Sequence, residues 1–435
     1  MVEVKKEEKE KHVYLLEVTV EEERVQEALK NAYRDLSSRV NIPGFRKGRA
    51  PWNILKTYLG KGAILDSLAR TLIPQVTREV LEQEKIEVIG EPEMEILHIA
   101  EDAPLVFRLQ VIENPTVLLP HPEDLEARKY RLEVRESDIE RELERLRVAR
   151  STWKEKEKES VAISGDLVKL TVQGRNYTIL AQEKDEQNAI AREVLGMKVG
   201  ESKKVALTNQ EGEATEVEFQ VTGLMEKEIP QIDQEFLRNL GSDIDSLETL
   251  RDKIRESLER LANDLVEERF QKEAIVALGK HSTVHIPAPL LELQTRHKID
   301  GFQDQLKKDG LTLERYLELT NTDFATVEKE LRKVAHWELK KFFVLQQYAK
   351  EYAIEASDED LDKELERLAQ ISGRTKEDVR EILTRNDKIE ETQERLKMQK
   401  LMEHLTSRVK VKTLEEPLNF DQWKVLENPE EEMIS

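Results

Sequence analysis

Apolar residues alternate with polar ones in two short segments of the N-terminal part of this 435-residue chain. Residues 12–20 and 105–113 both follow this period of two, which predicts β-strands with one buried face. Between them, apolar residues recur every three or four positions over residues 25–40 and again over residues 63–84, a spacing typical of amphipathic helices. The order of strand, helices and strand predicts a compact α+β head over residues 1–115.

The pattern changes beyond the head. A cluster of prolines interrupts it, and residues 116–150 are predicted to form a linker that contains one helix. Short segments with a period of two, separated by glycines, then fill residues 165–223, which predicts a small antiparallel β domain within residues 151–229. The expected strands cover residues 166–172, 176–181, 203–208 and 216–222.

Residues 230–435 carry a helical pattern almost to the end of the chain. Ser246 suits a helix N-cap, and an apolar seam follows it at Leu247, Leu250, Ile254, Leu258, Leu261 and Leu265. A helix that continues past Phe270 would be about 50 Å long, too long for one side of a small globule. Further helices are predicted over residues 288–308, 324–352, 358–372 and 386–409. The fold class is therefore multidomain α+β: an α+β head, a small antiparallel β domain and an extended all-α body with arms.

Composition narrows the chemistry of the chain. A formal net charge of -21 disfavours general affinity for nucleic acid, so any contact with RNA has to be local. The absence of cysteine excludes disulfides, thiol catalysis and thiolate metal sites. Residues 1–12 are rich in Lys and Glu, so no signal peptide is expected. No apolar run approaches the length of a membrane span, so no membrane partner is expected either.

Sequence motifs for nucleotide, hydrolase or metal chemistry are missing. Neither G-x-x-x-x-G-K-[ST] nor a strand-linked G-x-G-x-x-G occurs, which disfavours an ATP-driven cycle, and there is no G-x-S-x-G. His281 and His285 are four residues apart, but no third ligand is evident, and a solvated turn between helices explains them more simply. No catalytic residue, metal site or cofactor is therefore predicted.

The segment from Gly44 to Pro51 is a basic loop in an acidic protein. Six Lys or Arg residues and no Asp or Glu lie between positions 36 and 65, although Asp and Glu together number 90 in the chain. Glycines and prolines prevent continuous helix or strand here, so the side chains project from turns. A solvated basic turn is one interpretation. The other is a docking site for an anionic surface, with arginine forks for phosphate or carboxylate and Phe45 as an apolar anchor.

The loop matches the G-F-R-x-G-x-x-P motif of trigger factor, the family of bacterial ribosome-associated chaperones, at Gly44, Phe45, Arg46, Gly48 and Pro51. Arg49 stands where the family usually has Lys, so the positive charge is kept. Residues 151–155 resemble the junction before the family's second domain, and residues 286–292 resemble a helix start in its C-terminal domain. The resemblance implies a ribosome-binding loop formed by Gly44, Phe45, Arg46, Lys47, Gly48, Arg49 and Pro51.

Trigger factors carry a prolyl isomerase domain of the FKBP type where this chain has its predicted β domain, and residues 196–201 resemble part of it. The resemblance implies an FKBP-like fold in shortened form. An FKBP pocket encloses proline between aromatic walls, but Tyr177 and Phe219 are the only aromatic residues between positions 161 and 230. Residues 189–193 are charged where the family has an apolar segment. Isomerase activity is therefore expected to be weak or absent, although an active isomerase with chaperone flanks stays an alternative.

The sequence around Trp337 holds more apolar residues than one helix face can carry. The residues that widen the apolar surface are Trp337, Phe342, Phe343, Val344 and Tyr348. A wholly buried helix would explain this set. Alternatively, part of the set stays open as a cradle for client polypeptides, because large apolar patches on soluble proteins usually mark interaction sites.

The resemblance implies an ATP-independent cytoplasmic chaperone that docks on protein and rRNA of the large ribosomal subunit near the exit tunnel. Its clients would be nascent and partly folded polypeptides whose apolar segments it shields. The implied domains are ribosome-binding (1–115), linker (116–150), reduced FKBP-like (151–229) and helical client-binding (230–435). A weak homodimer is left open, as is a holdase or assembly factor for folded subunits that works away from the ribosome.

Overall fold

The computed structural model describes residues 2–40, 43, 45–46, 49, 51–157, 159–183, 189–208, 214–241 and 243–434. The chain divides into two compact units, each formed by segments that are distant in sequence. The first unit combines residues 1–129, 269–412 and 427–435, and the second combines residues 130–268 and 413–426. The predicted multidomain α+β class, with small antiparallel sheets and a long helical part, is confirmed.

The head of the first unit contains a four-stranded antiparallel sheet in the order β1-β2-β4-β3. Its strands are β1 (Val2–Glu10), β2 (Val13–Val20), β3 (Glu93–His98) and β4 (Leu105–Ile112). The predicted alternation is confirmed in β2 and β4, where Val18 lies opposite Phe107 and both side chains are fully buried. These two central strands therefore supply the inner face of the head core.

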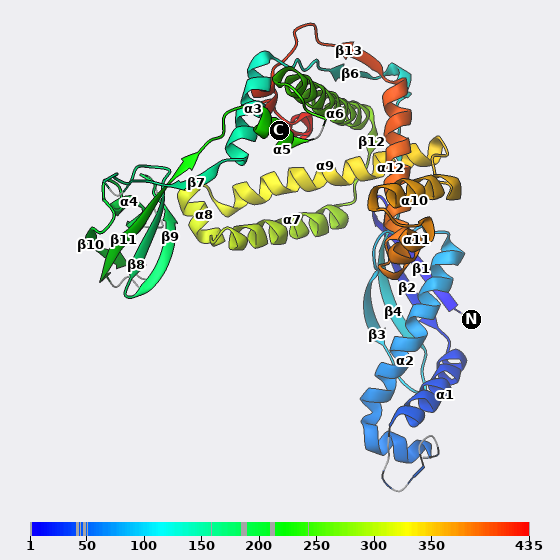
Figure 1. Cartoon of the computed structure of the whole chain (residues 1–435). Coiled ribbons are helices and arrows are strands. Elements are labelled where there is room, and N and C mark those ends of the chain that lie inside the picture. Colours follow the sequence, from blue (N-terminus) through cyan, green and yellow to red (C-terminus); the bar gives the residue numbers. More distant parts are fainter. Residues whose placement is uncertain are drawn as a thin grey trace. The chain divides into compact units, whose positions relative to one another are not determined.

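Two helices, α1 (Glu22–Arg39) and α2 (Trp52–Glu84), complete the head, and α2 runs along the sheet (Figure 1). Leu68, Leu72 and Val76 of α2 pack on the inner face of the sheet. The helix begins at Trp52 rather than at residue 63 as predicted. Gly60 has a φ of 81° within it, and this non-helical residue breaks the apolar period that would have revealed the first two turns.

The sequence pattern does not predict strands β1 and β3, which lie at the two edges of the head sheet. In β1 only Val2 and Val4 pack against the core, and the rest of the strand consists of Lys and Glu. Every residue of β3 is exposed. In both strands apolar residues alternate with charged ones over only four positions, residues 2–5 and 93–96, and this pattern is too short to be distinctive.

The helical part of the first unit begins with the end of α6 (Leu247–His281), a helix that contributes to both units. It continues with α7 (Ala288–Lys308), α8 (Leu313–Thr320), α9 (Phe324–Glu351), α10 (Asp358–Ser372), α11 (Lys376–Arg385) and α12 (Ile389–Arg408). Leu278, Val344, Tyr348 and Leu405 lie in its main core. Two short strand pairs join distant segments: β5 (Val117–Leu118) with β12 (Thr283–Val284), and β6 (Glu126–Lys129) with β13 (Lys410–Thr413).

Helix boundaries in this part follow local capping. The predicted helix over residues 288–308 is confirmed, and Ser357 caps α10 in a capping box with Asp360. Helix α11 is not predicted by the sequence pattern.

Glu364 of α10 is buried and accepts hydrogen bonds from Arg367 (2.7 Å) and from Arg395 of α12 (2.5 Å). These guanidinium groups lower the pKa of Glu364 to about 2, so the carboxylate that joins α10 to α12 stays charged.

The second unit contains a five-stranded antiparallel sheet in the order β10-β11-β8-β9, with β7 paired to β11. Its strands are β7 (Thr152–Glu155), β8 (Leu167–Val172), β9 (Arg175–Leu180), β10 (Ser202–Thr208) and β11 (Ala214–Glu228). The four predicted strands are confirmed, and β7, whose residues are all exposed, is additional. Val168, Leu170, Val194 and Phe219 form the core, and the short helix α4 (Ala189–Glu193) packs Ile190 against it.

A small helical cluster forms the rest of the second unit. It consists of α3 (Glu136–Ala149), α5 (Gln234–Leu240), the first part of α6 and α13 (Phe420–Lys424). Ile139, Phe236, Leu250 and Ile254 pack together at its centre. The apolar seam predicted after Ser246 therefore serves this cluster, because Leu250 and Ile254 belong to it.

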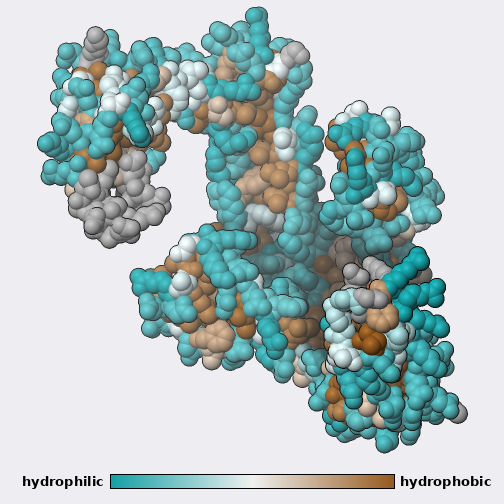
Figure 2. All heavy atoms as spheres, turned by 90° about the horizontal axis from the view of Figure 1, so that it is seen from below, coloured by the Kyte–Doolittle hydropathy of each residue, from teal (hydrophilic) through white to brown (hydrophobic). Residues whose placement is uncertain are grey.

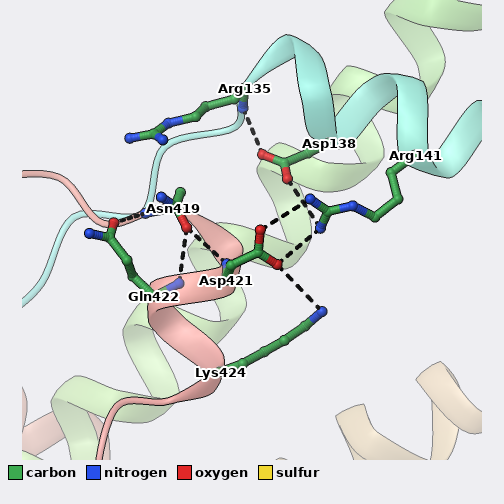
Figure 3. Close-up of polar contacts among 7 residues, drawn as sticks. All are labelled: Arg135, Asp138, Arg141, Asn419, Asp421, Gln422 and Lys424. Atoms are coloured by element: carbon green, nitrogen blue, oxygen red, sulfur yellow. Dashed lines mark hydrogen bonds and ion pairs between the residues drawn. The ribbon is translucent and has the colours of Figure 1, made fainter.

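The segment over residues 413–426 is fixed to this cluster by its backbone and by charged side chains. The Glu133 N–H donates to the Leu418 carbonyl oxygen (2.9 Å), and the Leu418 N–H donates to the Arg131 carbonyl oxygen (2.8 Å). Figure 3 shows the Arg141 guanidinium facing the Asp421 carboxylate, at 3.2 and 3.1 Å. The segment is therefore docked by bidentate pairing rather than hanging free.

Candidate docking loop and client-binding surface

The predicted docking loop connects α1 to α2 in the head. Of the predicted residues, the structure describes Phe45, Arg46, Arg49 and Pro51, whereas Gly44, Lys47 and Gly48 lie outside the described residues. Phe45 is 38% exposed, and Arg46 and Arg49 are also exposed. The Arg49 N–H donates to the Arg46 carbonyl oxygen (2.9 Å). One aromatic residue and two arginines are therefore exposed within five positions of the chain.

A small apolar cluster supports the base of this loop. Leu55, in the first turn of α2, is fully buried among Tyr33, Leu36, Val40 and Leu59. The Tyr33 ring also packs edge-to-face on Trp52, with ring centroids 5.2 Å apart. Sequence reasoning did not single out Tyr33 and Trp52. The two residues lie on either side of the loop in sequence, so their ring contact could not be predicted from local spacing. The aromatic residue directly after Pro51 was the one sequence feature that could have indicated it.

Four of the five predicted client-binding residues are buried in the helical part of the first unit. Trp337, Phe343, Val344 and Tyr348 are at most 1% exposed, whereas Phe342 is 54% exposed. Four of these positions on α9 therefore agree with a buried helix. Among the five residues, only Phe342 offers apolar surface that a client could reach. The physical reason is that α6, α12 and the segment around Glu430 pack against this part of the helix.

The buried aromatic residues of α9 are fixed by specific partners. The Trp337 indole N–H donates to Glu430 Oε2 (3.1 Å), and Lys341 Nζ donates to the same oxygen (2.8 Å). The Tyr348 hydroxyl lies 2.9 Å from His404 Nδ1. Burial raises the pKa of the Tyr348 phenol and lowers the pKa of the His404 imidazole, so both rings stay neutral near pH 7. This helix face is a structural core.

Apolar side chains are nevertheless exposed on the same helical part. They are Leu293 of α7, Leu319 of α8, Phe324 and Phe342 of α9, Ile371 of α10 and Met398 of α12. The face drawn in Figure 2 is mainly hydrophilic, with apolar residues gathered in separate patches. Several small patches of this kind suit weak contact with extended apolar polypeptide segments.

The two aromatic residues between positions 161 and 230 of the β domain, Tyr177 and Phe219, do not form a paired pocket wall. Phe219 is fully buried in the core, and Tyr177 lies on the sheet-edge strand β9 with 47% of its surface exposed. Neither residue packs its ring on another aromatic ring among the described residues. The buried Phe219 ring has no free face for a proline.

His281 and His285 do not converge on a common site. His281 Nδ1 lies 2.9 Å from the Ala277 carbonyl oxygen, whereas His285 faces Glu10, so the two rings have different partners. No group of three or more His, Cys, Asp or Glu residues in the described ranges is arranged to hold a metal ion. Nor does any described helix have the length and apolar content needed to cross a membrane.

Comparisons with known proteins agree over most of the chain. Residues 2–146 match the family described as "Bacterial trigger factor protein (TF)", and residues 246–407 match "Bacterial trigger factor protein (TF) C-terminus". The trigger factor of Moorella thermoacetica is 32% identical over 393 residues, which is 86% of this chain and 88% of that relative. The trigger factor of Natranaerobius thermophilus is 27% identical over 420 residues, which is 92% of this chain and 94% of that relative.

A solved structure described as "Promiscuous Substrate Recognition in Folding and Assembly Activities of the Trigger Factor Chaperone" covers 94% of this chain and 100% of that chain, with 24% identity and a TM-score of 0.49. An α+β head with a basic loop, a small β domain and a long helical part, together with the family matches, define a ribosome-associated chaperone. The chain belongs to the trigger factor family. Members of this family bind the ribosome and nascent chains, and the resemblance predicted from the loop is confirmed.

Proposed function

We propose that the loop over residues 43–51 docks this chain on the large ribosomal subunit beside the polypeptide exit tunnel. One observation carries the proposal: Phe45, Arg46 and Arg49 are all exposed in a segment without acidic residues. Ribosomal RNA presents closely spaced phosphates, and arginine can bind phosphate with two hydrogen bonds. Because the whole chain carries a formal charge of -21, approach by most other faces is repelled, so the loop also selects the orientation.

We further propose that the helical part of the first unit holds apolar segments of nascent and partly folded clients without nucleotide. Phe342 and the other exposed apolar residues of α7 to α12 supply the contact area. Apolar burial contributes roughly 25 cal/mol per Å², so each separate patch binds weakly. A client that folds buries the same side chains internally, which releases it. Hydrophobic burial thus accounts for both holding and release.

This assignment has consequences for the rest of the molecule. We keep the four-domain division given above, with residues 116–150 as linker. We also propose that the protein acts in the cytoplasm. Weak association of two free chains would use the same exposed apolar patches that bind clients. We also propose that the β domain serves as a folded spacer or an accessory client contact rather than as an enzyme.

Ribosome docking is tested by co-sedimentation of the full chain with purified ribosomes over a range of salt concentrations. If about three cations contact phosphate, the affinity should fall on the order of tenfold to fiftyfold for a fourfold rise in salt. Bovine serum albumin, which is also acidic, serves as the control for trapping in the pellet. Failure of the chain to co-sediment at low salt would overturn the docking proposal.

Prolyl isomerase activity of the full chain is expected to be weak or absent. The reason is the burial of Phe219 and the exposure of Tyr177, because these two residues then form no aromatic-walled slot that would favour a twisted prolyl amide. Exchange of an X-Pro peptide in the presence of the chain should therefore keep its uncatalysed time of tens to hundreds of seconds. An FKBP assayed in parallel provides the positive control, and a comparable rate for this chain would contradict the expectation.

A further inference from the structure

Strand β3 ends the head sheet and has a partner on one side only. Within the described residues it pairs with β4 and with no other strand. Backbone N–H and C=O groups along the outer side of an edge strand can accept a further strand. The six residues of β3, Glu93–His98, span about 20 Å, enough to pair with a short extended peptide.

An apolar groove lies directly beside this free edge. Met94 pairs with Leu109 and Ile96 pairs with Phe107, so these side chains share the inner face of the sheet. Helix α2 buries Leu109 and Phe107 completely or almost completely, but it leaves Met94 51% and Ile96 40% exposed. The resulting groove has a volume of about 900 Å³, and its apolar lining includes Ile73, Pro74, Leu81, Ile86, Met94 and Ile96. We refer to it as the β3 groove.

The charges around the β3 groove favour a basic partner. Asp66 and Arg70 at one end form an ion pair (3.0 Å) and offset each other. The other charged lining residues are three acids, Glu82, Glu87 and Glu91, and two bases, Arg78 and Lys85. The excess of carboxylates attracts Lys or Arg at the ends of a bound segment and disfavours acidic segments.

We propose that the β3 groove binds an extended polypeptide that adds to β3 as a further strand. Its apolar side chains, at every second position, enter the groove, and its Lys or Arg residues lie near the acidic rim. The free edge specifies an extended backbone, whereas an apolar groove alone would accept any hydrophobic partner. Identification of this peptide as a segment of a chaperone client rests on the proposed function; the binding itself requires neither the ribosome nor the helical part of the chain.

The test uses the full chain and a fluorescein-labelled peptide of about ten residues, with Val and Leu alternating with Thr and with Lys at both ends. Fluorescence anisotropy should show saturable binding to the wild-type chain. The double substitution Met94→Thr and Ile96→Thr keeps strand-forming residues but removes apolar surface, and it should weaken binding about tenfold. The matched control is Leu118→Thr with Val411→Thr, two exposed apolar strand residues outside the groove, which should leave the affinity unchanged.

Strand addition is separated from simple apolar contact by two N-methylated versions of the peptide. Each carries methyl groups on alternate backbone nitrogens, so that each blocks the hydrogen bonds of one peptide edge. One version should lose binding about tenfold and the other should bind as the parent peptide does. Equal affinity of both versions and the parent would overturn strand addition, and unchanged affinity of the Met94 and Ile96 variant would overturn the groove.

The outcome for the β3 groove is independent of the outcome for the docking loop. The Met94→Thr and Ile96→Thr variant should co-sediment with ribosomes as the wild type does, because its substitutions lie outside residues 43–51. A chain that binds the peptide but not ribosomes would refute docking and leave the groove supported. A chain that binds ribosomes but shows no saturable peptide binding would refute the groove and leave docking supported.

Discussion

Replacing Phe45, Arg46 and Lys47 together by alanine is expected to weaken ribosome binding at least about 100-fold. Loss of one buried aromatic anchor typically costs at least about 2 kcal/mol of binding free energy. Each lost charge-assisted hydrogen bond costs about 1.5–3 kcal/mol. Such losses remove the triple variant from the ribosomal pellet under conditions where the wild type is mostly bound. Quantitative co-sedimentation with a titration of ribosomes measures the change.

A matched triple variant distinguishes the loop from a general loss of charge. Arg175, Tyr177 and Lys227 are exposed residues of the β domain, and their replacement by alanine removes the same charge and one aromatic ring. This control should bind ribosomes like the wild type. Both variants should keep the far-ultraviolet circular dichroism of the wild type and should still suppress aggregation of a refolding protein without ATP. Retained ribosome binding by the loop variant would show that the loop is not the docking site.

The second large effect is expected in the core of the helical part, where Trp337→Ala should destabilise the fold by about 3–5 kcal/mol. Trp337 is 1% exposed, and its ring lies against Gly279 of α6 so closely that a Cβ there would be 2.6 Å from the ring. Gly279→Ala should therefore destabilise the wild type, because overpacking typically costs about 1–3 kcal/mol and exceeds the gain in helix propensity.

The sign of the Gly279→Ala effect should reverse once Trp337 is replaced by alanine. With the ring gone, the added methyl group occupies empty space, and alanine stabilises a helix by about 1 kcal/mol relative to glycine. Gly301→Ala in α7 is the control, because no atom lies within 4 Å of a Cβ at that position, and it should stabilise both backgrounds alike. The stability of each variant is measured from its denaturant midpoint, followed by circular dichroism. If the effects of Gly279→Ala and Trp337→Ala on stability simply add, the contact between the two residues is refuted.

The elements with strong local signals could be predicted from the sequence. Helix α7 has the predicted bounds because Pro287 and Pro289 mark its start and a regular apolar spacing follows. The motif of the proposed docking loop is equally local, since its glycine, proline and arginine residues occur at fixed spacing within eight positions. The family resemblance depended on such short-range features, and the matches over residues 2–146 and 246–407 confirm it.

The features that depend on distant contacts could not be predicted in the same way. The apolar excess of α9 allowed either a buried helix or an open cradle, and the choice depends on Glu430, which lies 93 residues beyond Trp337. The β3 groove was missed for a related reason. Every residue of its strand is exposed, and its apolar lining is divided between α2 and the residues that follow it up to Ile96, so neither segment carries the whole pattern.

The docked C-terminal segment determines when this protein can finish folding. Arg141 contacts Asp421 across 280 residues, and Arg128 contacts Glu432 across 304 residues. Synthesis proceeds from the N-terminus, so each of these arginines leaves the ribosome long before its partner does. The core of the head comes from residues 16–111, whereas neither compact unit is complete until the residues around Asp421 and Glu432 have been made. During its own synthesis, this chaperone of nascent chains is therefore itself a partly folded nascent chain.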